Sequence, residues 1–453
     1  TDPYQPAERE MRAMREVLEV LAAHDHPVSI VTKGTGIERD IDLLGPMAAK
    51  GLARVGISVT TLDPALSRAM EPRVPAPARR LATIRRLPKL QGHLYNWYDT
   101  RDLRVLEPAY VSSVDSGNLA GHLVALANAC EEWARAPQIA DARVGLLDAA
   151  RLALGAIGDL PPARAAEVGR ILEPIAEKLD SAQPLEEISP ALLRMADKAR
   201  TAAASDLRPE NAEPDLNYWI GALRRGLMEH DRDRTRSDAA ERLTALGREA
   251  RRIALAMNFA FLLDPDRKLL SIGYSAAENS LDPSCYDLLA SEARLASLFA
   301  IAKGDAPTRH WFRLGRTGTP VGAGAALVSW SGSMFEYLMP LLVIAEPPRS
   351  LLAESNRLVV RRQQAYGRSL GVPWGVSESA FNARDLEFTY QYSNFGVPGL
   401  GLKRGLADDV VIAPYATALA AMVDPHGAAL NYKRLAAMGA RGRYGFYEAL
   451  DFT

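Results

Sequence analysis

The chain has 453 residues, of which 48% are hydrophobic and 24% charged, and its formal net charge is −1. This composition is ordinary for a globular protein, and the balanced charge excludes a strong basic field for nucleic acid or an anionic membrane. No apolar run approaches the length that crosses a bilayer, so the sequence predicts no membrane span.

Residues 1–87 alternate between helical and strand patterns. Helices are expected at residues 7–23, 40–50, 64–70 and 77–87, and β-branched strands at 28–32 and 53–60. Strands and helices that alternate at this spacing are typical of parallel βα units. We therefore expect a small α/β fragment at this end of the chain.

From residue 88 to residue 453 the chain becomes mainly helical. Apolar residues recur every three or four positions, as on one buried helix face, at residues 119–133, 140–156, 163–178, 190–204 and 238–263. After residue 263 glycines, aromatic residues and short helices are interleaved, which is typical of loops that carry function. The sequence predicts a helical lead-in over 88–262 and the functional motifs over 263–453.

Three glutamates in the last part of the chain lie among aromatic, glycine and small residues. They are Glu336, Glu378 and Glu448. Aromatic rings stack on pyranose faces, and carboxyl groups serve as acid, base or nucleophile at an anomeric carbon. The pattern therefore predicts carbohydrate chemistry by paired carboxylates.

Each glutamate also has a simpler interpretation. Glu448 could begin a helix, where the macrodipole favours it, and Glu378 could be an exposed residue after Ser377 as a helix N-cap. Glu336 lies in an otherwise apolar helix, where it could tie helices together. Burial there would raise the pKa of Glu336, which suits a general acid. The acid/base role is left open between Glu336 and Glu378.

Further side chains are candidates for contacts with a sugar. Asp115 and Asn118 could bind hydroxyl groups or could form a turn. The aromatic candidates are Trp330, Trp374, Tyr390, Tyr392, Tyr444 and Tyr447, and the charged candidates are Arg384, Asp385, Lys403 and Arg404. Any one aromatic ring could instead pack in the core, and any one charged residue could be solvated.

No metal or cofactor is predicted. Cys130 and Cys285 match no metal-ligand spacing and suggest no disulfide framework. His122 and His310 are isolated from other ligand types. The glycine-rich run at 315–324 lacks the Gly-Lys-Ser/Thr ending of a phosphate loop.

The first fifth of the chain resembles the middle of a radical SAM protein of the group related to spore photoproduct lyase. The resemblance rests on Pro27-Val-Ser-Ile-Val-Thr-Lys, Arg39-Asp-Ile-Asp-Leu-Leu and Ile57-Ser-Val-Thr-Thr-Leu-Asp. That family holds an iron–sulfur cluster in a Cys-x-x-x-Cys-x-x-Cys loop. The first cysteine here is Cys130, outside this segment. The resemblance therefore implies an inactive fragment without a cluster.

Residues 88–453 resemble the central, glucoamylase-like domain of cyclic β-1,2-glucan synthases. The matching segments include His93-Leu-Tyr-Asn-Trp-Tyr-Asp-Thr-Arg, Leu281-Asp-Pro-Ser-Cys-Tyr-Asp-Leu-Leu-Ala-Ser-Glu-Ala-Arg, Trp330–Pro340, Val372–Asn382, Tyr390–Gly405 and Tyr444–Thr453. The resemblance implies an (α/α)6 toroid and a retaining transglycosylase that closes linear β-1,2-glucan into rings. Full-length members add a membrane-embedded glycosyltransferase and a phosphorylase-like domain, neither of which is recognisable here.

The resemblance implies that Glu448 attacks the anomeric carbon and that Glu378 or Glu336 is the acid/base. Hydrolysis of β-1,2-glucan is the first alternative, and a glucan-binding or inactive fragment is the second. We expect both ends to be cut from a longer protein, and a rearranged coding sequence is one explanation of the join near residue 88. The family implies a cytoplasmic location, at the inner face of a bacterial inner membrane. Its partner would be glucan, without nucleic acid.

Overall fold

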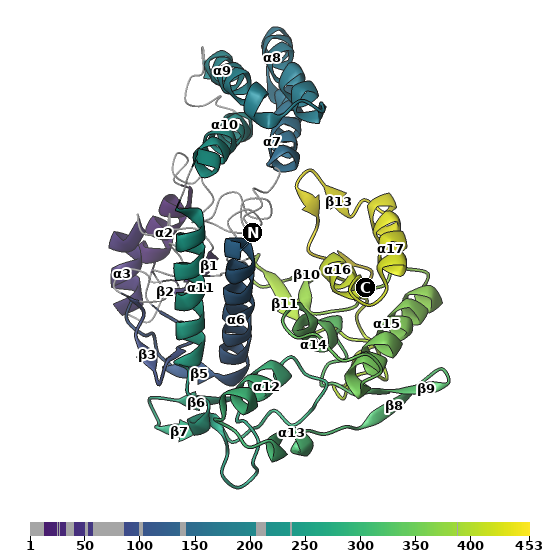
Figure 1. The fold of residues 1–453 in the computed structure, drawn as a ribbon. Coiled ribbons are helices and arrows are strands. Elements are labelled where there is room, and N and C mark those ends of the chain that lie inside the picture. Colours follow the sequence, from purple (N-terminus) through teal and green to yellow (C-terminus); the bar gives the residue numbers. More distant parts are fainter. Residues whose placement is uncertain are drawn as a thin grey trace. The chain divides into compact units, whose positions relative to one another are not determined.

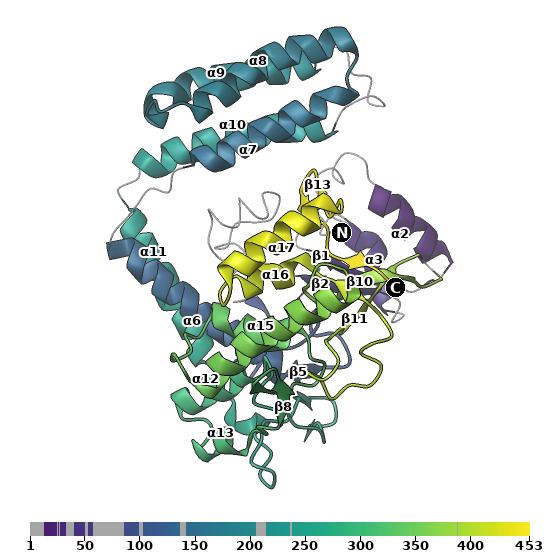
Figure 2. The same ribbon diagram turned by 90° about the vertical axis from the view of Figure 1, so that its right-hand side faces the viewer.

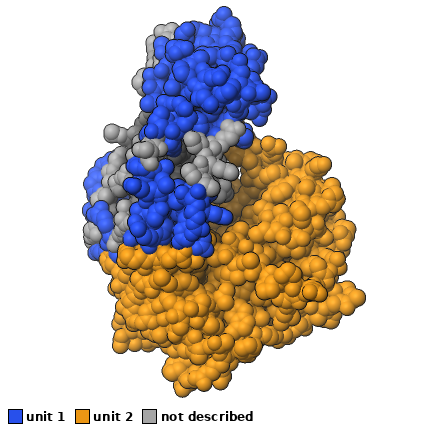
Figure 3. Space-filling model, in the orientation of Figure 1, with its two compact units in different colours: residues 1–87, 97–106, 126–250 blue, residues 88–96, 107–125, 251–453 orange. Residues whose placement is uncertain are grey.

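The computed structural model describes residues 13–24, 26, 28–32, 40–49, 53–57, 86–98, 103–135, 142–204, 214–235, 238–386 and 388–453. The chain divides into two compact units (Figure 3). Unit 1 comprises residues 1–87, 97–106 and 126–250, and unit 2 comprises residues 88–96, 107–125 and 251–453. Fourteen α-helices lie in the described part. The predicted mainly helical class is thus confirmed, and it is consistent with an α/α fold; the domain boundary near residue 88 stays a prediction.

Unit 1 begins with the small α/β part that the sequence predicts. Its elements are α2 (Ala13–Ala23), β1 (Val28–Thr32), α3 (Ile41–Ala49) and β2 (Ala53–Ile57). The two strands pair in parallel, with Val28 opposite Ala53, as expected for a βα unit. Arg15 of α2 forms an ion pair with Asp42, with Nη2 2.6 Å from Oδ2. The helix expected at residues 64–70 falls outside the described residues, and so do residues 77–85 of the helix expected at 77–87.

A four-helix bundle follows in unit 1 (Figure 2). It consists of α7 (Arg143–Gly155), α8 (Pro162–Asp180), α9 (Leu185–Ala204) and α10 (Pro214–Thr235). The predicted apolar faces meet in its interior, where Leu172, Ile175, Leu192 and Ile220 are fully buried. Helix α10 was not predicted from the sequence. The next helix, α11 (Ala239–Leu255), ends earlier than predicted, and a 3-10 turn at Ala260–Leu262 follows it.

Unit 2 combines helices with short strands (Figure 1). Its helices are the first half of α6 (Ser113–Arg135), α12 (Arg294–Lys303), α13 (Arg309–Arg313), α14 (Met334–Leu338), α15 (Leu351–Leu370), α16 (Pro414–Ala420) and α17 (Pro425–Ala437). A three-stranded sheet joins β5 (Tyr110–Ser112), β6 (Gly273–Ser275) and β7 (Ser280–Leu281). The antiparallel strand pairs are β3 (Lys89–Leu90) with β4 (His93–Leu94), β8 (Gly318–Val321) with β9 (Gly324–Leu327), β10 (Ser379–Arg384) with β11 (Tyr390–Ser393), β12 (Val411–Ile412) with β15 (Leu450–Asp451), and β13 (Arg441–Gly442) with β14 (Gly445–Phe446).

The core of unit 2 packs α14, α15, α16 and α17 around buried residues such as Tyr337, Val359 and Leu435. Glycines let the loop after β11 approach the segment before α14 very closely. A Cβ on Gly396 would lie 1.8 Å from the carbonyl oxygen of Ser331, so no other residue fits there without a backbone shift. This packing fixes the segment that carries Glu336. Within the ranges that the structure describes, no helix combines the length and apolarity needed to cross a bilayer.

Candidate active site

Glu336 lies in the first turn of α14, where serine groups surround its buried carboxylate. Its Oε2 accepts hydrogen bonds from Ser329 Oγ at 2.7 Å and from Ser331 Oγ at 2.6 Å, and the backbone N–H of Ser331 donates to the carboxylate as well. Ser333 caps the helix in a reciprocal arrangement with Glu336. These donors satisfy the buried carboxylate oxygens and offset the cost of burial. Because its oxygens are already engaged by this set of serine groups, Glu336 is poorly placed to face a leaving oxygen.

Glu378 lies just before β10, and no helix begins there, so the N-cap interpretation of Ser377 is wrong. The backbone N–H of Phe335 donates to Ser377 Oγ at 3.1 Å, which ties the first turn of α14 to this loop. Tyr415 donates its hydroxyl hydrogen toward the carbonyl of Glu378 at 2.9 Å. Burial raises the pKa of Glu378, a hydrogen bond from Tyr392 lowers it, and the charge of Glu336 raises it again.

A fourth glutamate, Glu292, shares this site. Burial raises the pKa of Glu292 to about 7, and the charges of Glu336 and Glu378 contribute to the rise. Ser291 Oγ donates to its Oε2 at 3.3 Å. Neighbouring carboxyls in a water-poor site disfavour each other's charged forms. Among these three carboxyls, Glu292 is the one whose pKa is raised close to neutral pH.

Sequence reasoning missed Glu292, although the segment that contains it was part of the family resemblance. Its neighbours Ser291 and Ala293 are small, so the aromatic surroundings that marked the other three glutamates are absent here. Proximity to Glu336 and Glu378 comes from tertiary packing. The run Ser291-Glu-Ala-Arg294 inside a long matching segment was the signal that could have found it.

Glu448 lies in a bend between β14 and β15, so the helix-start interpretation is wrong. Its Oε1 accepts a hydrogen bond from the backbone N–H of Ala380 at 3.0 Å. Burial raises the pKa of Tyr392 and that of Tyr415. The negative charges of Glu378 and Glu448 raise both values further. The structure thus brings the three predicted glutamates to one region of unit 2.

A pocket of about 360 Å³ adjoins Glu448. Its other lining residues are Pro414, Tyr415, Ala418, Tyr432, Phe446 and Tyr447. The rings of Tyr432 and Phe446 are 4.8 Å apart and tilted by 47°. Aromatic walls with one carboxylate at the edge suit a sugar ring, which offers apolar faces and hydroxyl groups.

A second set of phenols and carboxyls extends from Glu292 toward the start of α6. Burial raises the pKa of Tyr286 well above its usual value, and the charges of Glu292 and Asp115 raise it further. The hydroxyl group of Tyr110 donates a hydrogen bond to Asp282 Oδ2 at 3.4 Å. The tyrosines keep their protons at neutral pH, so the region offers both donors and acceptors to a polyhydroxylated ligand.

The predicted aromatic contacts divide into exposed and buried residues. Exposed rings belong to Trp330, Tyr390, Tyr392, Tyr444 and Tyr447. Trp374 is only 6% exposed and packs in the core of unit 2. Its backbone N–H and carbonyl both bond to the side chain of Asn431. Trp374 therefore fits the core interpretation, and its ring is not available for stacking on a sugar.

The predicted charged contacts mainly stabilise the loops around the site. Arg384 lies over the ring of Tyr390, with 4.3 Å from its guanidinium carbon to the ring centroid. Asp385 Oδ1 accepts from the backbone N–H of Thr389 at 2.8 Å within the hairpin of β10 and β11. Lys403 donates to the carbonyl of Asn394 at 2.9 Å. Arg404 is exposed.

Asp115 and Asn118 lie in the first turns of α6, so the turn interpretation is wrong. Asp115 is exposed, and its charge acts on Tyr286. The side-chain oxygen of Asn118 is buried and accepts no hydrogen bond from any residue that the structure describes. In the same described ranges, no three His, Cys, Asp or Glu side chains gather as metal ligands.

Sequence comparison gives the class of protein, and the matching part of the chain contains all four glutamates. Residues 284–453 match the family described as "Glycoamylase: Putative glucoamylase". The chain is also 49% identical over 392 residues to the cyclic beta-(1,2)-glucan synthase NdvB of Rhizobium meliloti. That match covers 82% of this chain and 14% of the synthase, so the chain spans a small part of its relative. These findings confirm the predicted resemblance to cyclic β-1,2-glucan synthases.

Other comparisons involve shorter or more distant matches. Two proteins described as uncharacterized, from Mycobacterium bovis and Mycobacterium tuberculosis, are 42% identical over 84 residues, which is 18% of this chain and 25% of theirs. The endo-beta-1,2-glucanase of Talaromyces funiculosus, solved with sophorose, is 14% identical with a TM-score of 0.40 over 68% of this chain and 69% of that one. A "putative glucoamylase" of Bacteroides fragilis is 16% identical with a TM-score of 0.35 over 66% and 75%.

Proposed function

We propose that this chain carries a retaining transglycosylase site that acts on linear β-1,2-glucan and closes it into a ring. The observation that supports this most directly is Glu292, with its pKa of about 7, beside the charges of Glu378 and Glu336. Retaining glycosidases need one protonated and one ionised carboxyl at the scissile bond. The similarity to a cyclic β-1,2-glucan synthase supplies the substrate class.

The roles follow from the environments of the carboxyls. Glu292 donates its proton to the leaving glycosidic oxygen while the carboxylate of Glu378 attacks the anomeric carbon; the C1–O bond breaks and a glycosyl ester forms. A hydroxyl of the same glucan then attacks C1, gives its proton to Glu292 and releases Glu378. The charge of Glu336 raises the pKa of Glu292 and so helps to keep the proton there.

This proposal differs from the sequence-based one in two roles. Glu378 replaces Glu448 as the nucleophile because the charge of Glu378 acts on Glu292. Glu292 replaces Glu336 or Glu378 as acid/base because hydrogen-bond donors already occupy the carboxylate of Glu336. Glu448 becomes a substrate contact at the aromatic pocket. The cytoplasmic location and the (α/α)6 ring belong to the same proposal and rest on the family resemblance.

Product analysis tests the reaction. The purified chain is incubated with linear β-1,2-glucan in ¹⁸O-labelled water, and the products are weighed by mass spectrometry. A ring weighs one water less than the linear glucan of equal length and carries no label. Shorter, labelled linear products would identify a hydrolase instead, and glucan binding without turnover would leave a binding fragment.

Azide tests the residue roles. In Glu292→Ala, azide should restore turnover and yield a β-glycosyl azide, because the ester on Glu378 still forms. In Glu378→Ala, azide should attack directly and yield the α-azide. The opposite stereochemistry would exchange the two roles, and rescue of neither variant would remove both residues from the mechanism.

A further inference from the structure

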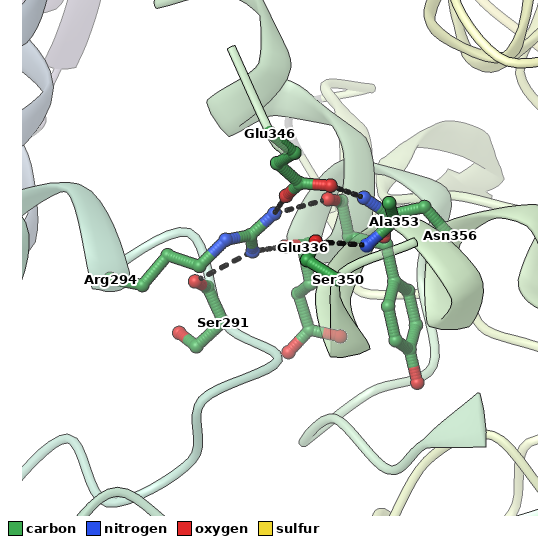
Figure 4. Close-up of polar contacts among 8 residues, drawn as sticks. Ser291, Arg294, Glu336, Glu346, Ser350, Ala353 and Asn356 are labelled. Atoms are coloured by element: carbon green, nitrogen blue, oxygen red, sulfur yellow. Dashed lines mark hydrogen bonds and ion pairs between the residues drawn. The ribbon is translucent and has the colours of Figure 1, made fainter. Parts of the chain in front are cut away.

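Arg294, the first residue of α12, is buried at 2% exposure, and its guanidinium group faces main-chain carbonyls (Figure 4). Nη1 lies 3.0 Å from the carbonyl oxygen of Ser291 and 2.9 Å from that of Glu336. Nη2 lies 2.6 Å from the carbonyl oxygen of Tyr337. One nitrogen thus bridges the peptide group that precedes Glu292 and the carbonyl of Glu336.

The carbonyls at the end of α14 need such a donor. This helix has five residues, and the last carbonyls of any helix lack partners within it. A continuing helix would offer the carbonyl of Glu336 the N–H of residue 340, but Pro340 has none. Arg294 supplies the missing hydrogen bond from a different part of the chain.

A carboxylate holds the guanidinium in place. Glu346 Oε1 lies 3.3 Å from Nη2 of Arg294, and Asn356 of α15 donates to Glu346 Oε2 at 2.7 Å (Figure 4). Arg294 and Asn356 are each 2% exposed. A buried charge is costly to leave without its partner, so the pair keeps one geometry. Three helical regions therefore meet at one guanidinium.

We propose that Arg294 is a positioning residue, which sets the separation of Glu292 and Glu336 by bridging their main chains, with Glu346 as its anchor. The catalytic meaning of this separation rests on the function proposed above. The bridging hydrogen bonds of Arg294 do not depend on that function, and their effect on Glu292 can be measured without turnover.

Replacement by lysine is the informative change. Lysine keeps the positive charge but lacks the planar fork, so it cannot reach the same carbonyls together. The groups that face Glu292 are Glu336, Glu378, Tyr286 and Arg294 itself. In Arg294→Lys we expect Glu292 to move away from the two carboxylates and toward water. Its pKa should then fall by about one unit or more toward that of an ordinary glutamate.

Kinetics should show the same displacement. The alkaline limb of kcat/KM should move to lower pH by the same amount. kcat should fall roughly 10- to 100-fold, while KM changes by less than about threefold, because a small misplacement affects the reacting geometry more than binding. Arg316→Lys is the matched control, since Arg316 also donates to two carbonyls of unit 2, those of Leu314 and Trp311. It should leave the pH profile unchanged.

Glu346→Gln and Asn356→Ala weaken the contacts that hold the guanidinium group, without removing Arg294 itself. They should lower the pKa of Glu292 in the same direction but by less. These two variants carry the test if Arg294→Lys does not fold. An unchanged pH profile in both of them would then overturn the proposal.

A direct titration separates this proposal from the proposed function. Proteins with ¹³C-labelled glutamate carboxyls are titrated by NMR, and Glu292→Gln assigns the signal of Glu292. A fall in the pKa of Glu292 in Arg294→Lys supports positioning even if the wild-type chain turns over no glucan, which would refute only the function. An unchanged pKa in a folded Arg294→Lys overturns positioning, whatever the activity.

Discussion

The carboxyl groups of Glu292 and Glu336 differ in how many hydrogen-bond donors surround them. Three serines direct hydroxyl and N–H groups at the carboxylate of Glu336, whereas Ser291 Oγ donates to Glu292 at a longer 3.3 Å. Hydrogen bonds to a carboxylate favour its charged form, and burial without them favours the protonated form. The two side chains are chemically identical, so the different roles proposed for them follow from the atoms around them.

The raised pKa of Glu292 predicts a dependence of stability on pH. The pKa of Glu292 rises from an ordinary 4.5 to about 7, so the folded chain binds this proton more tightly than the unfolded chain. The contribution is present below pH 4.5 and is lost as the pH rises through 7, by about 3 kcal/mol in all. Glu292→Gln should remove it. Urea denaturation at a series of pH values measures this, and equal pH slopes for both proteins would contradict it.

Glu448→Gln distinguishes a substrate contact from a nucleophile. The amide oxygen can still accept the hydrogen bond from Ala380, so the local structure should survive. We expect KM to rise several-fold while kcat stays within about tenfold of the wild-type value, as for lost ground-state binding. Steady-state kinetics on linear β-1,2-glucan provide the measurement. Complete loss of kcat with unchanged circular dichroism would return Glu448 to the nucleophile role that the sequence suggested.

Sequence patterns predicted the long elements well, because a long element repeats its pattern of apolar residues several times. Helices α6 to α9 and the parallel pair of β1 and β2 follow from periodicity and β-branched runs. Two-residue strands such as β12 and β15 contain too few residues for any period to appear. They form because distant segments meet, which a local pattern does not encode.

The same distinction between local patterns and tertiary packing applies at the candidate site. Aromatic and glycine neighbours identified Glu336, Glu378 and Glu448 locally. The proximity of Glu292 depends on tertiary contacts between segments far apart in sequence, such as those of Arg294 with the carbonyls of Glu336 and Tyr337. Trp374 shared the local pattern of a sugar contact, but its backbone N–H donates to Asn431 and its carbonyl accepts from Asn431, which fixes it within the core. Its burial could not be inferred from neighbouring residues.

The hairpin of β10 and β11 gives a test at the level of one element. Asp385→Ala removes the bond from the backbone N–H of Thr389, at a local cost of about 1 kcal/mol. Because the hairpin carries Tyr390 and Tyr392, we expect faster amide hydrogen exchange over residues 379–393 and a higher KM. Asp385→Asn keeps an acceptor and should resemble the wild type. Unchanged exchange in Asp385→Ala would show that the hairpin does not need this bond.

At the scale of the whole molecule, each unit has a hydrophobic core of its own. Leu172→Ala leaves a cavity inside the bundle of unit 1 and should reduce the free energy of unfolding by about 2–5 kcal/mol. The titration of Glu292 in unit 2 should remain at its wild-type pH. Calorimetry and the NMR titration measure the two effects. A shift in the pKa of Glu292 would show that the units are energetically linked.

Pro340 has a consequence for how mutations combine. Because it lacks an N–H, the carbonyl of Glu336 relies on Arg294. In a Pro340→Ala background an N–H becomes available to that carbonyl, so Arg294→Lys should do less damage than in the natural sequence. A double-mutant cycle would report this as non-additivity. The residue at position 340 therefore sets how much change position 294 tolerates, and the two positions are expected to constrain each other during evolution.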